Sequence, residues 1–348
     1  MKIAPYTLTA TEAVQAIASG RLSSVDLVKS CLAQIADTDA SINAWAYLDP
    51  ESALAQAAEC DRIRKAGLGT GPLHGLPVGL KDVIDTRDMP TQRGTDIFKD
   101  RQPDKDARLV ERLRESGAVI MGKTVTTELA FVHANDTRNP HNPEHSPGGS
   151  SSGSAAAVAA CHVPLAVGTQ TNGSVIRPAS FCGTFGFKPT RGVISRAGVL
   201  KTSDSLDQVG CFGRSLEDVA LLTDALAGYD QADSCSFARP RPQMRAGAQA
   251  EAPVAPDLVW FNLPFYDRLS PDAHEGMEAV LDVLGPRITR MAAADTLANL
   301  VAVQARIHEY EICQHQAAVF DANFEDLSRE LQLIVARGRK ISDAEYTD

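Results

Sequence analysis

The sequence predicts an α/β protein, in which helices cover the faces of a sheet, because apolar segments of strand length alternate with segments of helical periodicity. Residues 76–80 (LPVGL) form a short apolar run of the kind expected for a buried strand. Residues 109–113 carry apolar side chains on one helical face, and residues 118–121 (AVIM) form a second apolar run. Such alternation is typical of α/β proteins.

The N-terminal segment predicts two helices ahead of these units. Thr9 and Glu12 fit a capping box that opens a short helix, which Gly20 stops. Ser24 is expected to cap a second helix. Its apolar side chains recur at the spacing of one helical face: Val28, Cys31, Leu32 and Ile35.

The composition changes after about residue 230. Residues 232–257 are rich in Ala, Pro and Arg and predict a surface connection. Residues 258–261 (LVWF) predict a strand, and the remainder of the chain to residue 348 has a helical pattern.

Composition and charge exclude several classes of protein. With 44% hydrophobic and 22% charged residues, the chain has the balance of a globular protein rather than of a disordered, collagen-like or membrane protein. A net charge of −10 repels phosphate backbones, so nucleic acid is a poor partner. The chain has no apolar run fit for a signal peptide or a membrane span, and its seven scattered cysteines are expected to be free thiols. We therefore expect a cytoplasmic protein.

The middle of the chain is rich in small residues. Residues 146–154 read SPGGSSSGS and are followed by AAAVAA and, after a short apolar segment, by TQTNGSVIRP. Small residues allow a backbone to approach another backbone or a ligand closely. A flexible linker is the alternative, but apolar segments that can form structure follow directly.

Three catalytic templates fail on this segment. Residues 149–153 match a G-x-S-x-G nucleophile elbow, which needs a strand before it, whereas residues 138–148 contain three prolines. His141 and His145 have the spacing of helical metal ligands, but Pro143 breaks that helix, so we predict no metal. A phosphate-binding loop would end in Gly-Lys-Ser/Thr, which is absent.

A serine activated by a lysine remains. Ser174 follows Thr171, Asn172 and Gly173, whose backbone N–H groups can converge on one point, as an oxyanion requires. A serine is a weak nucleophile until a neighbour accepts its proton. Lys81 ends an apolar strand, where burial would lower its pKa from about 10.4 toward 7 at a cost of about 4 kcal/mol.

Three segments closely resemble the amidase signature family. They are residues 148–190, with the glycine- and serine-rich core, residues 75–86 (GLPVGLKDVIDT), and residues 197–222. The resemblance covers about residues 5–230 in the family's order. It implies one α/β/α domain over residues 1–348, with a central mixed sheet flanked by helices. The core variant is similar to malonamidase-type members and to the A subunits of amidotransferases.

The resemblance also implies the roles of individual residues. Ser174 matches the family's acyl-ester nucleophile, Ser150 the serine that relays the proton and follows a cis peptide bond from Gly149, and Lys81 the base. The backbone that matches the oxyanion hole belongs to Thr171, Asn172, Gly173 and Ser174. No metal or organic cofactor is implied.

Two residues near the nucleophile depart from the common family pattern. Asp is frequent where Gln170 stands, and Arg177 lies one residue later than usual. Members with this Val-Ile-Arg spacing act on small substrates that carry a carboxylate. Arg177 is therefore expected either to clamp an acid group of the substrate or to bond loop carbonyls as a structural residue.

The sequence thus predicts an amidase that hydrolyses a linear, non-peptide carbon–nitrogen amide bond of a small molecule. It needs no membrane, and a homodimer is an allowed assembly. One alternative is the A subunit of a glutamine-dependent amidotransferase. The other is a non-catalytic, truncated member, because family members usually continue beyond the point that matches Asp348.

Overall fold

The computed structural model describes residues 3–263, 265–292 and 297–348. Its centre is a six-stranded sheet with the strand order β1-β3-β2-β4-β6-β5. The strands are β1 (Trp45–Leu48), β2 (Pro77–Lys81), β3 (Val119–Thr124), β4 (Leu165–Gln170), β5 (Phe185–Phe187) and β6 (Gln208–Gly213). Strand β2 is parallel to β3 and β4, whereas β1, β6 and β5 pair antiparallel with their neighbours. The predicted mixed sheet is confirmed.

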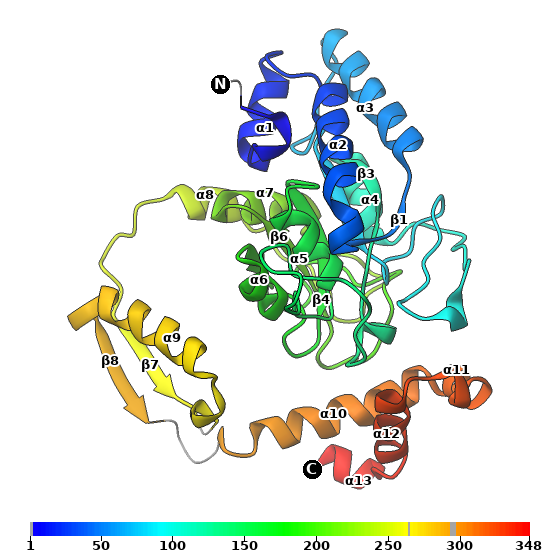
Figure 1. The fold of residues 1–348 in the computed structure, drawn as a ribbon, viewed down its shortest axis with the longest axis vertical. Coiled ribbons are helices and arrows are strands. Elements are labelled where there is room, and N and C mark those ends of the chain that lie inside the picture. Colours follow the sequence, from blue (N-terminus) through cyan, green and yellow to red (C-terminus); the bar gives the residue numbers. More distant parts are fainter. Residues whose placement is uncertain (1–2, 264, 293–296) are drawn as a thin grey trace.

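Helices flank this sheet (Figure 1). In the first 250 residues they are α1 (Ala10–Ala18), α2 (Ser24–Ile42), α3 (Pro50–Lys65), α4 (Arg108–Glu115), α5 (Ser152–Ala159), α6 (Ile176–Cys182), α7 (Leu216–Leu226) and α8 (Met244–Gln249). Helices α3 and α4 contact β3, α5 contacts β2, β3 and β4, and α7 contacts β4, β5 and β6. The sheet therefore has the helical cover that the α/β pattern predicted.

The starts of the first two helices follow from their capping residues. The Thr9 side chain accepts from the Glu12 backbone, and the Glu12 side chain accepts from the Thr9 N–H, so the predicted capping box is present. The prediction of Ser24 as the second cap is wrong by one residue. Ser23 is the cap, because its hydroxyl accepts from the Asp26 N–H, while Ser24 donates its N–H to Asp61.

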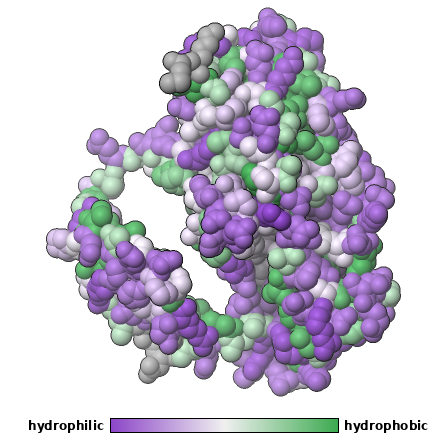
Figure 2. Space-filling model, viewed as in Figure 1, coloured by the Kyte–Doolittle hydropathy of each residue, from purple (hydrophilic) through white to green (hydrophobic). Residues whose placement is uncertain are grey.

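The chain then forms a small lobe that stands apart from the body. It consists of β7 (Leu258–Asn262), α9 (Pro271–Leu284) and β8 (Ile288–Ala292), and the two strands are parallel. Figure 2 shows an open gap between this lobe and the body. Several apolar side chains of α9 are exposed, and Val283 is 87% exposed. The predicted surface connection, residues 232–257, leads to the lobe and contains the half-exposed helix α8, which contacts α7.

The prediction of a purely helical pattern after residue 261 is wrong at β8. This five-residue segment has little apolar periodicity of its own, and its strand conformation depends on pairing with β7 across the α9 crossover. The remaining helices are α10 (Leu300–His315), α11 (Ala317–Ala322), α12 (Arg329–Gly338) and α13 (Asp343–Thr347).

Helices α10 to α12 return to the body (Figure 1). Ile312, Phe320, Leu331 and Val335 belong to the same hydrophobic core as the sheet residues. Across the described residues, no helix is both long enough and apolar enough to cross a membrane.

Candidate active site

Lys81 lies at the C-terminal end of β2 and is fully buried. Its Nζ donates to the Ser150 hydroxyl at 2.7 Å and to the Thr169 hydroxyl at 2.8 Å. Burial lowers the pKa of Lys81 from 10.5 to about 7, because a charged amine loses its hydration there. The negative charge of Asp207 raises this pKa and the positive charge of Arg177 lowers it. The amine is thus poised to exchange a proton near neutral pH.

Ser150 lies within the glycine-rich segment, two residues before α5 begins, and it is 2% exposed. The Gly149–Ser150 peptide bond is cis, as the resemblance implied. The interpretation of this segment as a flexible linker is wrong, because residues 150–158 are buried. The small residues are required by close packing: a Cβ on Gly153 would lie 2.3 Å from the Ala44 carbonyl oxygen. This packing fixes the Ser150 backbone beside β3, where the Ser150 carbonyl accepts from the Thr127 N–H at 3.3 Å.

Ser174 lies in the turn between β4 and α6 and is 6% exposed. The Ser151 N–H donates to the Ser174 carbonyl oxygen at 3.3 Å, so the two serine-bearing segments are in contact. Within the described ranges, no direct hydrogen bond joins the Ser150 hydroxyl to the Ser174 hydroxyl. A proton relay between them would require the two hydroxyls to come within hydrogen-bond reach of each other.

The turn before α6 leaves backbone donors free. The Gln170 side-chain oxygen accepts from the N–H groups of Val175 and Ile176 at 2.9 and 3.0 Å. In the part of the chain that the structure describes, the N–H groups of Asn172 and Gly173 have no protein acceptor, and neither has that of Ser174. An oxyanion hole requires unpaired backbone donors of this kind.

Arg177 bridges the two serine-bearing segments. Its Nε donates to the Gly149 carbonyl oxygen at 2.9 Å, and its guanidinium lies beside Gly173. The residue is nevertheless exposed. The loop-carbonyl contact is the one expected of a structural arginine, and the two terminal nitrogens have no hydrogen-bond acceptor in the described ranges.

Two further residues of the site, Thr169 and Asp207, were not singled out from the sequence, and a third, Gln170, was noted only as a departure from the family pattern. Thr169 accepts from Lys81, Gln170 organises the turn, and Asp207 binds the Thr171 hydroxyl at 2.6 Å. The sequence could have indicated Thr169, because it is the next-to-last residue of β4, the strand that leads to Ser174. Asp207 had no such signal, because it precedes a strand far along the chain.

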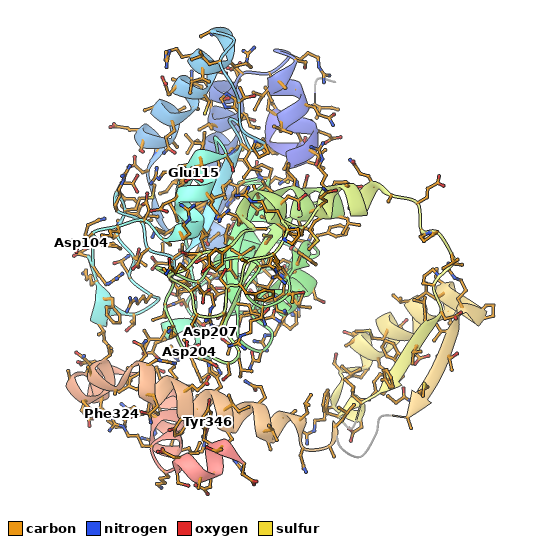
Figure 3. All side chains as sticks on the ribbon, turned by 180° about the vertical axis from the view of Figure 1, so that it is seen from behind. Asp104, Glu115, Asp204, Asp207, Phe324 and Tyr346 are labelled. Atoms are coloured by element: carbon orange, nitrogen blue, oxygen red, sulfur yellow. The ribbon has the colours of Figure 1, made fainter. Side chains whose placement is uncertain are left out.

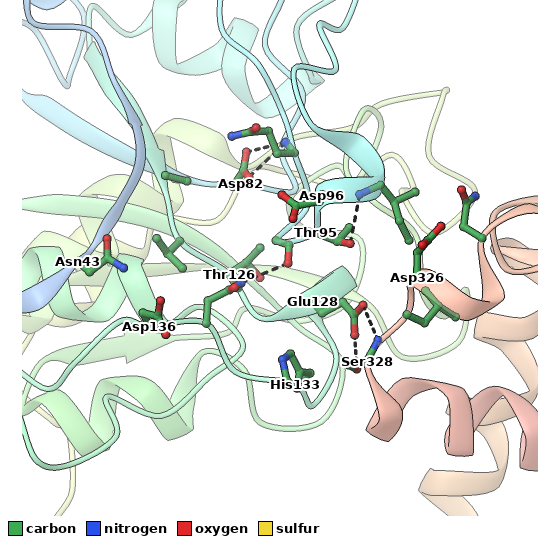
Figure 4. A pocket seen from close by; sticks show the side chains of 18 of the residues that line it. Asn43, Asp82, Thr95, Asp96, Thr126, Glu128, His133, Asp136, Asp326 and Ser328 are labelled. Carbon is green, nitrogen blue, oxygen red and sulfur yellow. Dashed lines mark hydrogen bonds between the residues drawn. The ribbon is translucent and has the colours of Figure 1, made fainter.

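One small cavity adjoins these residues, and a larger one lies beside Asp82, the neighbour of Lys81 in the chain. The small cavity, of about 20 Å³, room for a single water, is lined by Thr169, Thr171 and Asp207. A much larger one of about 820 Å³ is lined by Asp82, Glu128 and residues of the C-terminal segment such as Ser328 (Figure 4). Its lining excludes all three proposed reacting residues. It is therefore not assigned as the substrate pocket, although Asp82 directly follows the lysine.

The six-stranded mixed sheet and the helices that flank it define an α/β protein. The family model described as Amidase matches residues 26–340, and the chain belongs to this family.

Curated relatives are similar over much of the chain. The A subunit of glutamyl-tRNA(Gln) amidotransferase from Chloroflexus aggregans is 42% identical over 247 residues, which are 69% of this chain and 51% of the relative. Its counterpart from Thermobifida fusca is 39% identical over 329 residues, 90% of this chain and 65% of the relative. The chain thus spans about half to two thirds of the length of these relatives.

Solved structures agree over nearly the whole chain. A vestigial protein complex described as revealing the evolutionary origins of an s-triazine catabolic enzyme has a TM-score of 0.89 and 32% identity, and the match covers 98% of this chain and 75% of that one. The peptide amidase of Stenotrophomonas maltophilia has a TM-score of 0.82 and 29% identity, with 99% and 78% covered.

Proposed function

We propose that this protein is an amidase that hydrolyses the carbon–nitrogen bond of a small amide through an acyl-serine intermediate, without a metal or organic cofactor. The observation that carries the proposal is the buried Lys81 amine bonded to the Ser150 hydroxyl, with a pKa near neutrality. A lysine with an ordinary pKa is charged at pH 7 and accepts no proton.

In the proposed reaction, the Ser174 oxygen attacks the carbonyl carbon while its proton passes to Ser150 and the Ser150 proton passes to neutral Lys81. The oxyanion is stabilised by the free N–H groups of the turn. The carbon–nitrogen bond then breaks, and the leaving nitrogen takes the proton back along the same path. Water then attacks the serine ester and gives a proton to the same relay. The ester bond breaks, and the Ser174 oxygen takes this proton back, which regenerates the hydroxyl.

The second candidate function is that of an amidotransferase component that supplies ammonia. It is favoured by the curated relatives, which are named as the A subunits of such enzymes. A component of this kind would release ammonia from glutamine and pass it to partner subunits. The same serine chemistry serves both functions, so the substrate and the dependence on partners separate them.

The substrate of the first candidate is proposed to carry a carboxylate. Arg177 is exposed beside Gly149 and Gly173, and its two terminal guanidinium nitrogens have no acceptor in the described ranges. A guanidinium binds a carboxylate with two parallel hydrogen bonds. A half-amide should therefore be turned over faster than its diamide, and Arg177→Ala should remove this preference; an unchanged preference rejects the clamp.

The test is ammonia release from aliphatic, aromatic and carboxylated amides and from glutamine, the last with and without candidate partner subunits. Ser174→Ala should abolish release, whereas Ser180→Ala, which changes an exposed serine of α6, should not. Glutamine turnover that strictly requires partners favours the amidotransferase. A folded wild-type protein that releases ammonia from none of these compounds supports the non-catalytic alternative.

A further inference from the structure

Asp207 lies next to the turn that carries Ser174, just before the strand β6 that neighbours β4. It immediately precedes β6, which pairs with β4 so that Gln208 faces Gln170. Asp207 therefore faces Thr171, the first residue of the turn. Its position is set by sheet register rather than by a flexible loop.

The Asp207 carboxylate is saturated with donors. One oxygen accepts from the hydroxyls of Thr171 and Thr202 at 2.6 and 2.9 Å. The other accepts from the N–H groups of Thr202 and Ser203 at 2.7 and 2.8 Å. Four short bonds to one carboxylate fix its position and hold the Thr171 hydroxyl in one orientation.

Helix α10 contacts the loop around Asp207, and Figure 3 shows Asp204 and Asp207 next to this helix. The His308 ring lies 3.1 Å from the Thr202 hydroxyl. Glu311 accepts from the hydroxyls of Ser203 and Ser205. The loop that surrounds Asp207 is thereby tied to a helix of the core.

The charge of Asp207 also reaches the proposed base. Burial is the main cause of the lowered pKa of Lys81; the charge of Asp207 raises this pKa, and that of Arg177 on α6 lowers it. Asp207 also lines the same small cavity as Thr169, whose hydroxyl accepts from the Lys81 amine. Asp207 therefore offsets part of the effect of burial and keeps the amine from becoming too weak a base.

We propose that Asp207 is a positioning residue, which holds Thr171 and the turn of Ser174 in place and supplies the negative charge that acts on the Lys81 amine. This role rests on the proposed amidase function. It differs from a purely structural role, because it couples one carboxylate to both the turn and the base.

Two sets of variants separate the two parts of the role. Asp207→Asn removes the charge and keeps the shape, since an amide oxygen can accept from the two N–H groups while the NH2 faces the threonine hydroxyls. Thr171→Val removes the hydroxyl and keeps the charge, and Thr171→Ser restores the hydroxyl. Asp218→Asn is the matched control. Asp218 is a buried carboxylate that accepts from the Thr11 N–H and hydroxyl, away from the site.

The readout is the pH profile of kcat/KM for the most active amide. The acid limb of this profile is the rise of kcat/KM with pH as Lys81 becomes neutral. Asp207→Asn removes a charge that raises the pKa of Lys81, so it should move this limb to lower pH by about one unit, the lower end of the effect of a nearby charge. Thr171→Val should lower kcat about tenfold to a hundredfold, with little change in KM or in the limb, and Thr171→Ser should recover most of the activity. Asp218→Asn should leave the limb in place.

Two results overturn the proposal: an acid limb that Asp207→Asn leaves unmoved, or a kcat that Thr171→Val leaves unchanged. The second holds even when Asp207→Asn does not fold. If Ser174→Ala is inactive and one of these two results is obtained, the role of Asp207 is rejected and the proposed function stands. Full activity in Ser174→Ala rejects the proposed function itself.

Discussion

Replacing Lys81 by methionine removes the proposed base while it keeps an unbranched apolar side chain in a fully buried position. The expected consequence follows from the pKa of the amine, which burial lowers from 10.5 to about 7. At pH 7 an ordinary lysine is neutral in roughly one molecule in 3,000, whereas a lysine of pKa 7 is neutral in about half. The shift corresponds to roughly 5 kcal/mol, which the fold supplies by excluding water from the amine.

The assay is ammonia release as a function of pH. In the wild type, kcat/KM should rise with pH and level off above about pH 7, because the free enzyme needs a neutral Lys81. Lys81→Met should lose about 10²- to 10⁴-fold in rate, the usual contribution of a general base.

Lys123 provides the matched control. It is also fully buried, on the neighbouring strand, and donates to the Ile84 carbonyl and the Thr91 hydroxyl. Lys123→Met should lower the free energy of unfolding by about 1–3 kcal/mol and leave the acid limb at its wild-type pH. A wild-type limb below about pH 5.5, or near-normal turnover by Lys81→Met, would refute the assignment of the base.

Three further predictions follow from the same geometry. Ser150→Ala should lower kcat at least about 100-fold in the ammonia assay because the relay is lost, and near-wild-type turnover would exclude the relay. Gln170→Leu should lower the free energy of unfolding in urea by about 1–3 kcal/mol, since two N–H groups at the start of α6 lose their acceptor. Gln170→Glu keeps an acceptor and should be close to the wild type; equal losses in both variants would contradict the explanation. Burial lowers the pKa of His308 from 6.5 to about 4, so between these values the unfolded chain binds more protons and stability falls as the pH decreases, by at most roughly 3 kcal/mol. His308→Gln should flatten this dependence in thermal unfolding, with the remaining slope due partly to His162, whose pKa is also lowered to about 4; an unchanged slope would refute the contribution of His308.

The sequence predicted those parts of the fold and site in which local pattern and structure agree. The apolar run before Lys81 is β2, and the glycine-rich segment packs against the sheet at the place where its small residues are needed. The contact between Lys81 and Ser150 joins residues 69 positions apart. It was expected from the family resemblance, since spacing alone does not bring them together.

The remaining features depend on tertiary contacts. Asp207 reaches Thr171 only through the pairing of β6 with β4, which no local pattern encodes. Strand β8 needs β7 as a neighbour. The cap of α2 is Ser23 and not the predicted Ser24, whose N–H donates to Asp61 on another helix. In each case the local structure depends on a partner that is distant in the sequence.

The proposed function requires the hydroxyl of Ser174 to act as the nucleophile. Labelling with a fluorophosphonate probe, followed by intact-mass measurement and peptide mapping, tests this role. We predict one adduct on Ser174 in the wild type and none in Ser174→Ala. A folded wild-type protein that stays unlabelled, or an adduct on another serine, would contradict the account.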